Sequence, residues 1–126
     1  MPYLLSAETA FSAAHTLPDG GECSRLHGHN WRVRVTVRVE DDALDGAGMG
    51  VDFRVLEDTA RAAVADFEHR LLNELPVFAG RVPSAEHLAR IVFERVAERV
   101  NSYPGVEAHE VELWEMPQYR AVYRPR

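Results

Sequence analysis

The chain has 126 residues, 46% of them hydrophobic, and a formal net charge of −6 at pH 7. This length suits one domain, residues 1–126, with a single core, and the acidic balance argues against a nucleic-acid partner. All 14 basic residues are arginines, which excludes a Schiff-base lysine or a P-loop lysine. The only cysteine, Cys23, cannot form an intrachain disulfide, so we expect a reducing, cytoplasmic location. No apolar stretch approaches the roughly 20 residues that cross a bilayer, and we expect no membrane partner.

The first half of the chain predicts two β-strands. Residues 3–12 form the first, which continues toward His15, and the Pro-Asp-Gly-Gly sequence at 18–21 indicates a turn. Residues 31–40 alternate, with Trp31 and four valines on one face and three arginines among the polar residues of the other. We expect these arginines to meet acidic groups or to line a solvated channel between subunits. An ordinary solvent-exposed face is the alternative.

The second half predicts two helices followed by two strands. Asp52 is a candidate N-cap, and Ser84 is a second one after Pro83. The apolar stripe of the first helix contains Phe53, Leu56, Ala60, Ala63, Val64, Phe67 and Leu71, and that of the second contains Leu88, Val92, Val96 and Val100. We expect the first helix to fray near residues 68–73 and strands to follow at about 107–115 and 119–124. The layout predicts an α+β fold, a ββααββ antiparallel sheet with two helices on one face.

The clearest candidate for chemistry is the segment of residues 23–30, Cys-Ser-Arg-Leu-His-Gly-His-Asn. In an extended chain, side chains at i and i+2 point to the same side, so His27 and His29 can present two imidazoles to one point. His15 is the nearest third imidazole. Three histidines with an open fourth position favour a zinc site, although nickel and iron also bind imidazole, and the three histidines could instead be unrelated.

Cys23 lies four residues before His27 in a polar, turn-rich loop. A nearby metal cation and Arg25 would both favour its thiolate form, so it could be a fourth ligand or a proton-transfer group. A small buried hydrophobic side chain is the third possibility. Glu68 and His69 form an adjacent acid and imidazole pair at the expected helix end, where a solvated flank explains them equally well. Glu115, near the end of a strand, also has an adequate structural explanation.

Several short motifs occur together in an order typical of one family. They are Phe11-Ser12-Ala13-Ala14-His15, the segment 23–30, Val51-Asp52-Phe53, Glu68-His69 with Leu72-Asn73, Pro83-Ser84-Ala85-Glu86, and Glu115. With these motifs the chain resembles the 6-pyruvoyltetrahydropterin synthase and 6-carboxytetrahydropterin synthase family over essentially its whole length. It departs from the family at Glu68, where aspartate is usual, and at Ser84, where threonine is usual.

The resemblance implies a tunnelling fold, in which trimers of subunits form a β-barrel and two trimers stack into a homohexamer with active sites between subunits. It implies His15, His27 and His29 as zinc ligands. It implies Cys23 as the catalytic thiol, Glu68 and His69 as a proton-relay pair, and Glu115 as the carboxylate that binds the pterin. Ser84 and Arg25 are further candidates for substrate binding, and Arg120 and Arg124 could also meet the triphosphate.

The implied substrate is 7,8-dihydroneopterin triphosphate. The short Cys-Ser-Arg-Leu-His-Gly-His form favours the 6-carboxy reaction of 7-deazaguanine (queuosine precursor) biosynthesis, a zinc-dependent lyase reaction that releases acetaldehyde and triphosphate. The alternatives are 6-pyruvoyltetrahydropterin synthase activity on the same substrate and a zinc- and pterin-binding module without turnover. A zinc hydrolase is a weaker alternative, because no convincing general base accompanies the predicted ligands.

Overall fold

The computed structural model describes residues 2–18 and 21–125, apart from the side chain of Cys23. Its strands are β1 (Tyr3–His15), β2 (His27–Val39), β3 (Arg70–Leu71), β4 (Val106–Met116) and β5 (Tyr119–Tyr123). Its α-helices are α1 (Phe53–Val64) and α2 (Ala85–Val100). The connections contain the 3-10 turns η1 (Glu22–Ser24), η2 (Asp41–Ala43), η3 (Ala65–Phe67), η4 (Leu72–Glu74) and η5 (Pro76–Phe78). Within the described residues, no helix is long and apolar enough to cross a membrane.

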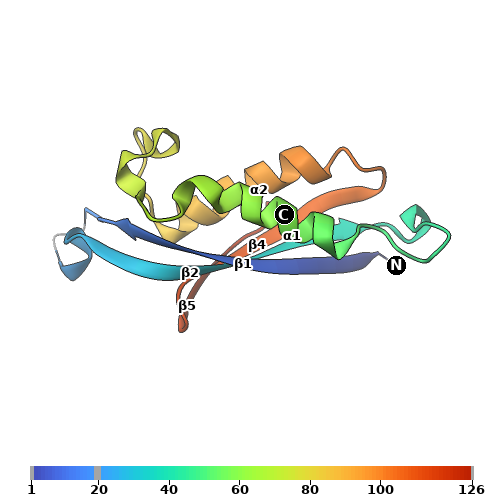
Figure 1. Cartoon of the computed structure of the whole chain (residues 1–126), viewed down its shortest axis with the longest axis horizontal. Coiled ribbons are helices and arrows are strands. Elements are labelled where there is room, and N and C mark those ends of the chain that lie inside the picture. The colour runs from blue at the N-terminus through green and yellow to red at the C-terminus, as the bar shows by residue number, and fades with distance from the viewer. Residues whose placement is uncertain (1, 19–20, 126) are drawn as a thin grey trace.

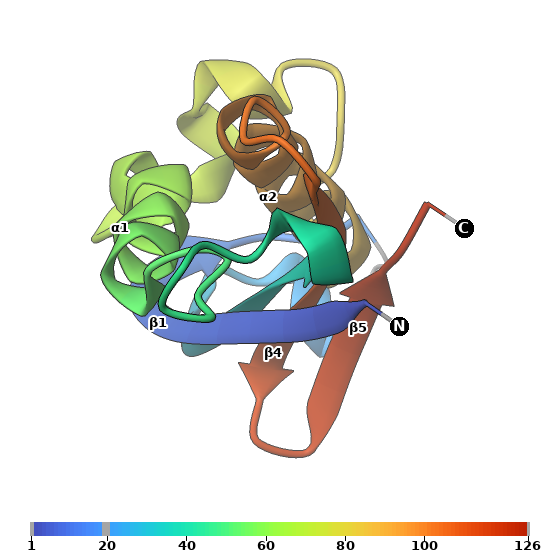
Figure 2. The same cartoon turned by 90° about the vertical axis from the view of Figure 1, so that its right-hand side faces the viewer.

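The strands form one sheet in the order β3-β1-β2-β4-β5, with both helices on the same face (Figures 1 and 2). β1 and β2 pair antiparallel over their whole length, from Tyr3 opposite Val39 to His15 opposite His27. α1 packs mainly on β1, whereas α2 packs on β4 and β5. The core between the two layers contains Trp31 and the valines of β2, as their alternation predicts. The predicted α+β layout with two helices on one face is confirmed.

Two details of the fold differ from the prediction. The sheet is mixed, because the two-residue strand β3 runs parallel to β1 at its edge. α1 ends at Val64 and does not extend to residues 68–73. The chain leaves the helical path because Glu68 and His69 bond to β1: Ser12 N–H donates to Glu68 Oε1 at 3.1 Å, and His69 N–H donates to the Ser12 carbonyl at 2.6 Å. Pairing with a strand edge therefore overrides the continuing helical pattern of apolar residues.

Both predicted helix caps are present. Asp52 Oδ1 accepts a hydrogen bond from the Arg54 N–H at 2.8 Å, and Ser84 Oγ accepts one from the His87 N–H at 3.2 Å. Phe53 does not join the core, and 58% of its surface is exposed, because it stands at the first position of α1, where the helix enters from a surface loop.

The arginine-rich face of β2 meets acidic groups. Arg34 lies 2.8 Å from Glu8 and 3.1 Å from Glu112, which is itself 2.9 Å from Arg120. Arg32 stacks over the Trp114 ring at 3.9 Å from its centroid. The like charges of this face are therefore neutralised within one chain, which confirms the expectation that the arginines meet acidic groups. The channel between subunits stays a prediction.

Candidate metal centre

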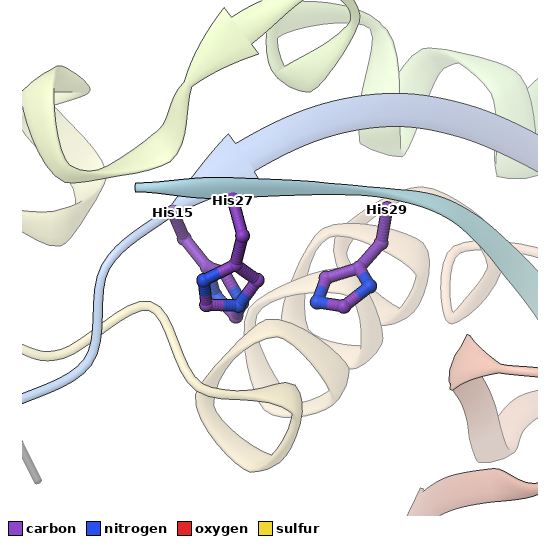
Figure 3. Close-up of side chains that lie close together, drawn as sticks. All are labelled: His15, His27 and His29. Atoms are coloured by element: carbon purple, nitrogen blue, oxygen red, sulfur yellow. The ribbon is translucent and has the colours of Figure 1, made fainter. Parts of the chain in front are cut away.

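Three imidazoles converge where β1 ends and β2 begins (Figure 3). His15 and His27 are directly opposite each other in the antiparallel pair, and His29 follows two residues later on the same face. One ligand nitrogen from each of the three histidines lies within 4.8 Å of the other two. The convergence that the His-x-His spacing predicts is therefore present, and it comes from the strand register.

Hydrogen bonds determine which ring nitrogens face inward. His15 Nδ1 lies 2.8 Å from the carbonyl of Pro83, and His27 Nδ1 lies 2.7 Å from the carbonyl of Arg25. A carbonyl only accepts, so each Nδ1 carries the proton and each Nε2 of the neutral ring keeps a free lone pair. The Nε2 atoms of His15 and His29 are buried, and neither has a hydrogen-bond partner among the described residues. This is the arrangement that metal-binding histidines show, with the outer nitrogen held by a carbonyl.

Burial favours the uncharged form of His15 and His29. Removal from water lowers the pKa of His15, which is fully buried, and it also lowers the pKa of His29. The neighbouring imidazoles lower both pKa values further, while Glu115 acts in the opposite direction. A metal ion binds only the neutral ring, so the environment prepares these side chains for coordination.

Packing keeps the rings in place. The buried Trp31 ring stands edge-on to both His15 and His29, with centroids 5.1 and 5.2 Å away, and its Nε1–H donates to the Ala13 carbonyl. Beyond His15, the Asn73 side chain accepts from the Thr16 N–H at 2.9 Å and donates to the Thr16 carbonyl at 3.1 Å. The end of β1 is thus held on both sides, so little rearrangement would be needed to receive an ion.

Glu115, from the end of β4, is brought to the histidines. Its two carboxylate oxygens lie 3.7 Å from His15 Nε2 and 3.7 Å from His29 Nε2, and 23% of its side chain is exposed. Position 115 belongs to the core face by the alternation of β4, two residues after the buried Leu113. Glu115 therefore lies beside two of the three imidazoles, while the group of mutually close ligand atoms consists of the histidines.

The pair Glu68 and His69 lies at the outer edge of β1, apart from this cluster. His69 Nε2 is 3.1 Å from Glu68 Oε1, and 81% of the His69 side chain is exposed. His69 borders a cavity of about 470 Å³ that Ser12, Asn30 and His29 also line. In Figure 3 the three imidazoles extend from the same side of the sheet, whereas β3, which follows His69, is the neighbour of β1 at the edge of the sheet. Among the described residues, neither Glu68 nor His69 belongs to the group of side chains that converge as possible metal ligands.

The backbone at His69 has an unusual conformation. Its φ of 56° is in the left-handed region, where few residues other than glycine occur. The two hydrogen bonds between the Glu68–His69 segment and Ser12 hold this conformation and turn the imidazole outward. Such a locally strained residue is typical of a functional site.

The other predicted site residues have mixed outcomes. The side chain of Cys23 lies outside the described part of the chain, so its predicted role is untested. Ser84 caps α2 immediately after Pro83, whose carbonyl holds His15. Arg25 is exposed, and its backbone carbonyl orients His27. Arg120 pairs with Glu112 and Arg124 pairs with Glu110.

Sequence reasoning missed the two carbonyls that orient the cluster. Pro83 and Arg25 act through backbone oxygens, which every residue carries, so no residue type marks them. The approach of Glu115 to the ring nitrogens could have been found by extending the register of β2 and β4. That pairing sets Arg32 opposite Trp114, and one further step brings Glu115 beside Trp31.

Comparisons with known proteins agree with this site. The family described as 6-pyruvoyl tetrahydropterin synthase matches residues 4–126. A 6-carboxy-5,6,7,8-tetrahydropterin synthase of Bacillus subtilis is 31% identical and covers 97% of this chain and 85% of its own. One of Synechocystis is 34% identical and covers 86% of this chain and 84% of its own.

The fold has a close match among solved structures. The 6-pyruvoyl tetrahydropterin synthase of Caenorhabditis elegans superposes with a TM-score of 0.84 at 24% identity, covering 100% of this chain and 97% of that one. This likeness shows the fold, and the family match extends over nearly the whole sequence. The chain belongs to the 6-pyruvoyl tetrahydropterin synthase family.

Proposed function

We propose that this protein is a 6-carboxytetrahydropterin synthase. It converts 7,8-dihydroneopterin triphosphate to 6-carboxy-5,6,7,8-tetrahydropterin and releases acetaldehyde and triphosphate. The observation that carries the proposal is the cluster of three histidines, two of which have buried Nε2 atoms without a partner among the described residues, in a chain whose bacterial relatives bear this name. We place the protein in the cytoplasm, which its single cysteine supports.

Zinc is the proposed metal, because three neutral imidazoles with a remaining position suit its tetrahedral geometry. His15, His27 and His29 would hold it. When bound, zinc supplies a Lewis acid that lowers the pKa of the substrate's side-chain hydroxyls and stabilises negative charge on their oxygens. The carbonyls of Pro83 and Arg25 keep two of the rings in the tautomer that this requires.

The pterin ring and the triphosphate need separate partners. The Glu115 carboxylate can accept two N–H bonds from the edge of the pterin, which selects a guanine-like ring. Ser84 lies beside the His15 support at the N-terminus of α2 and is a further candidate for contacting the substrate. Because the chain has no lysine, the phosphates must be held by arginine side chains, backbone N–H groups or metal, and exposed Arg25 is the arginine nearest the histidines in sequence.

Proton transfer is assigned to Cys23 and to the Glu68–His69 pair. Glu68 Oε1 lies 3.1 Å from His69 Nε2, so the carboxylate can orient the imidazole and stabilise its charged form. The His69 side chain is 81% exposed and does not belong to the histidine group of its own chain. We therefore propose that His69 of one subunit serves the metal of another.

A homo-oligomer with active sites between subunits, most simply the hexamer of the family fold, would satisfy this requirement. Within the described residues, the outer edge of β5 pairs with no strand, and the outer edge of β1 pairs with β3 only at Ala13 and Ala14. Free sheet edges of this kind pair readily with another chain. The arginine-rich face of β2 would then line the channel of the barrel.

The test is product analysis. Purified protein loaded with zinc is incubated with 7,8-dihydroneopterin triphosphate, and mass spectrometry should find the 6-carboxy product together with acetaldehyde. A product that retains all three side-chain carbons, without acetaldehyde, would assign 6-pyruvoyl activity instead. Binding of zinc and pterin with no product would leave only a binding module.

A Cys23→Ala variant separates the two roles open to the thiol. If Cys23 transfers protons, the variant keeps its zinc and loses turnover by a factor on the order of 100 to 10,000. Loss of the zinc would identify Cys23 as a ligand. Zinc content and turnover are measured on the same preparation.

A further inference from the structure

The carboxylate of Glu115 has an unusual relation to the histidine cluster. Oε2 lies 3.7 Å from Nε2 of His15, and Oε1 lies 3.7 Å from Nε2 of His29. Each oxygen thus faces a different imidazole, and the carboxylate spans the two rings. Its 23% exposure leaves it accessible from solvent, whereas His15 is completely buried.

At His15, the two atoms that face one another are both acceptors. His15 gives its Nδ1 proton to the Pro83 carbonyl, so its Nε2 presents a lone pair toward the carboxylate. The Nε2 atoms of both rings are buried without a hydrogen-bond partner in the described chain. The buried lone pair of His15 and the carboxylate that faces it repel one another unless a cation lies between them.

The distances distinguish a shared proton from a metal ion. A charge-assisted hydrogen bond from an imidazolium to a carboxylate measures about 2.7–2.9 Å, well below the observed 3.7 Å. Two atoms bound to one tetrahedral zinc ion at about 2.0–2.2 Å lie roughly 3.4 Å apart. The spacing of Glu115 from both rings is therefore close to the separation of two ligands of one ion.

The fold gives this carboxylate room to move. The pairing of β4 with β5 shifts register between Trp114 and Met116, so Glu115 occupies the irregular position. A bulge of this kind re-aims a side chain and leaves its residue outside the regular ladder. Glu115 can consequently change its rotamer without breaking the sheet.

We propose that Glu115 is the fourth ligand of the metal when no substrate is bound and that it leaves the metal to bind the pterin. The second half of this inference rests on the proposed function, whereas the first half requires only that the histidines hold a metal. The carboxylate then closes the coordination position that the substrate hydroxyls need. Pterin binding withdraws the carboxylate and opens that position in the same event.

Metal affinity of a matched pair of variants tests the first half. Glu115→Gln removes the charge with little change of shape, and Glu107→Gln does the same on β4 at a side chain that is 59% exposed and contacts Arg38. Zinc affinity is measured by competition with a chromophoric chelator. We expect E115Q to bind zinc at least about tenfold more weakly than the wild type, since loss of outer-shell partners alone costs 10- to 100-fold, and E107Q to be unchanged.

A second test uses the unaltered protein, so it does not depend on whether a variant folds. Cobalt(II) replaces zinc, and its visible absorption bands report the ligands. We expect azide to leave the spectrum unchanged, because Glu115 fills the fourth position, and a non-reacting pterin that carries side-chain hydroxyls to shift it. A spectrum that azide shifts in the wild type, or zinc affinity that E115Q leaves intact, would overturn the inference while product formation still supported the proposed function. If E115Q shows the expected loss of zinc affinity but the wild type forms no product, the proposed function is rejected and the role of Glu115 as a metal ligand still stands.

Discussion

Mixing two inactive variants tests whether the catalytic site is shared between chains. His27→Ala removes one predicted metal ligand, and His69→Ala removes the predicted relay imidazole. Because 81% of the His69 side chain is exposed, its removal should leave the fold intact. Each variant alone should lose turnover, by a factor on the order of 100 to 10,000 for the relay imidazole.

The expected activity of the mixture follows from where the residues lie. The three imidazoles point to one side of the sheet by strand alternation, while His69 lies at the edge of β1, is 81% exposed and stands outside that group. Suppose that a site takes its metal ligands from one chain and His69 from another. In a 1:1 mixture, half of the chains (H69A) then have all three metal ligands, and the other half (H27A) have His69. Randomly assembled 1:1 oligomers should therefore recover about a quarter of the wild-type activity, since the two choices are independent.

The assay is acetaldehyde release after the two variants are co-expressed, with each variant alone as the control. Zinc content of the mixture should fall to about half, because only the H69A chains keep all three ligands. Activity no higher than that of the single variants would show that each site lies within one chain. That result would refute the reasoning from strand alternation.

Three further predictions concern stability and rate. Burial lowers the pKa of His15 and His29, so below about pH 6.5 the unfolded chain binds more protons than the folded one. The metal-free protein should therefore lose thermal stability as the pH falls through that value. A melting temperature that stays constant from about pH 7.5 to 5.5 would contradict this. Glu68→Asp restores the usual family residue but shortens the side chain that accepts a hydrogen bond from the Ser12 N–H at 3.1 Å. Turnover should fall by up to about 100-fold. An unchanged rate would show that the backbone compensates for the shorter side chain. Ser84→Ala removes the cap of α2 and should lower the free energy of unfolding by about 1 kcal/mol in urea denaturation, whereas Ser84→Thr should retain most of it.

Local sequence pattern determined most of the architecture. The alternation from Trp31 onward predicted a strand with one buried face, and the intervals of Leu88, Val92, Val96 and Val100 predicted α2, since both depend only on the period of the backbone. The His-x-His spacing predicted that two imidazoles would point the same way for the same reason. Asp52 and Ser84 were recognisable as caps because their side chains bond within three residues.

Tertiary structure decided what local pattern cannot encode. The helical stripe suggested that α1 runs past Val64, yet hydrogen bonds to Ser12, more than fifty residues away in sequence, draw Glu68 and His69 to the edge of β1 and create β3. The carbonyls that orient His15 and His27 and the approach of Glu115 to the ring nitrogens likewise arise from chain packing. The sequence by itself determined which groups could bind a metal and which faces would be buried, because these follow from residue type and backbone period. Only the folded chain decided which nitrogens face inward and which acid joins them, because those choices depend on contacts between segments far apart in sequence.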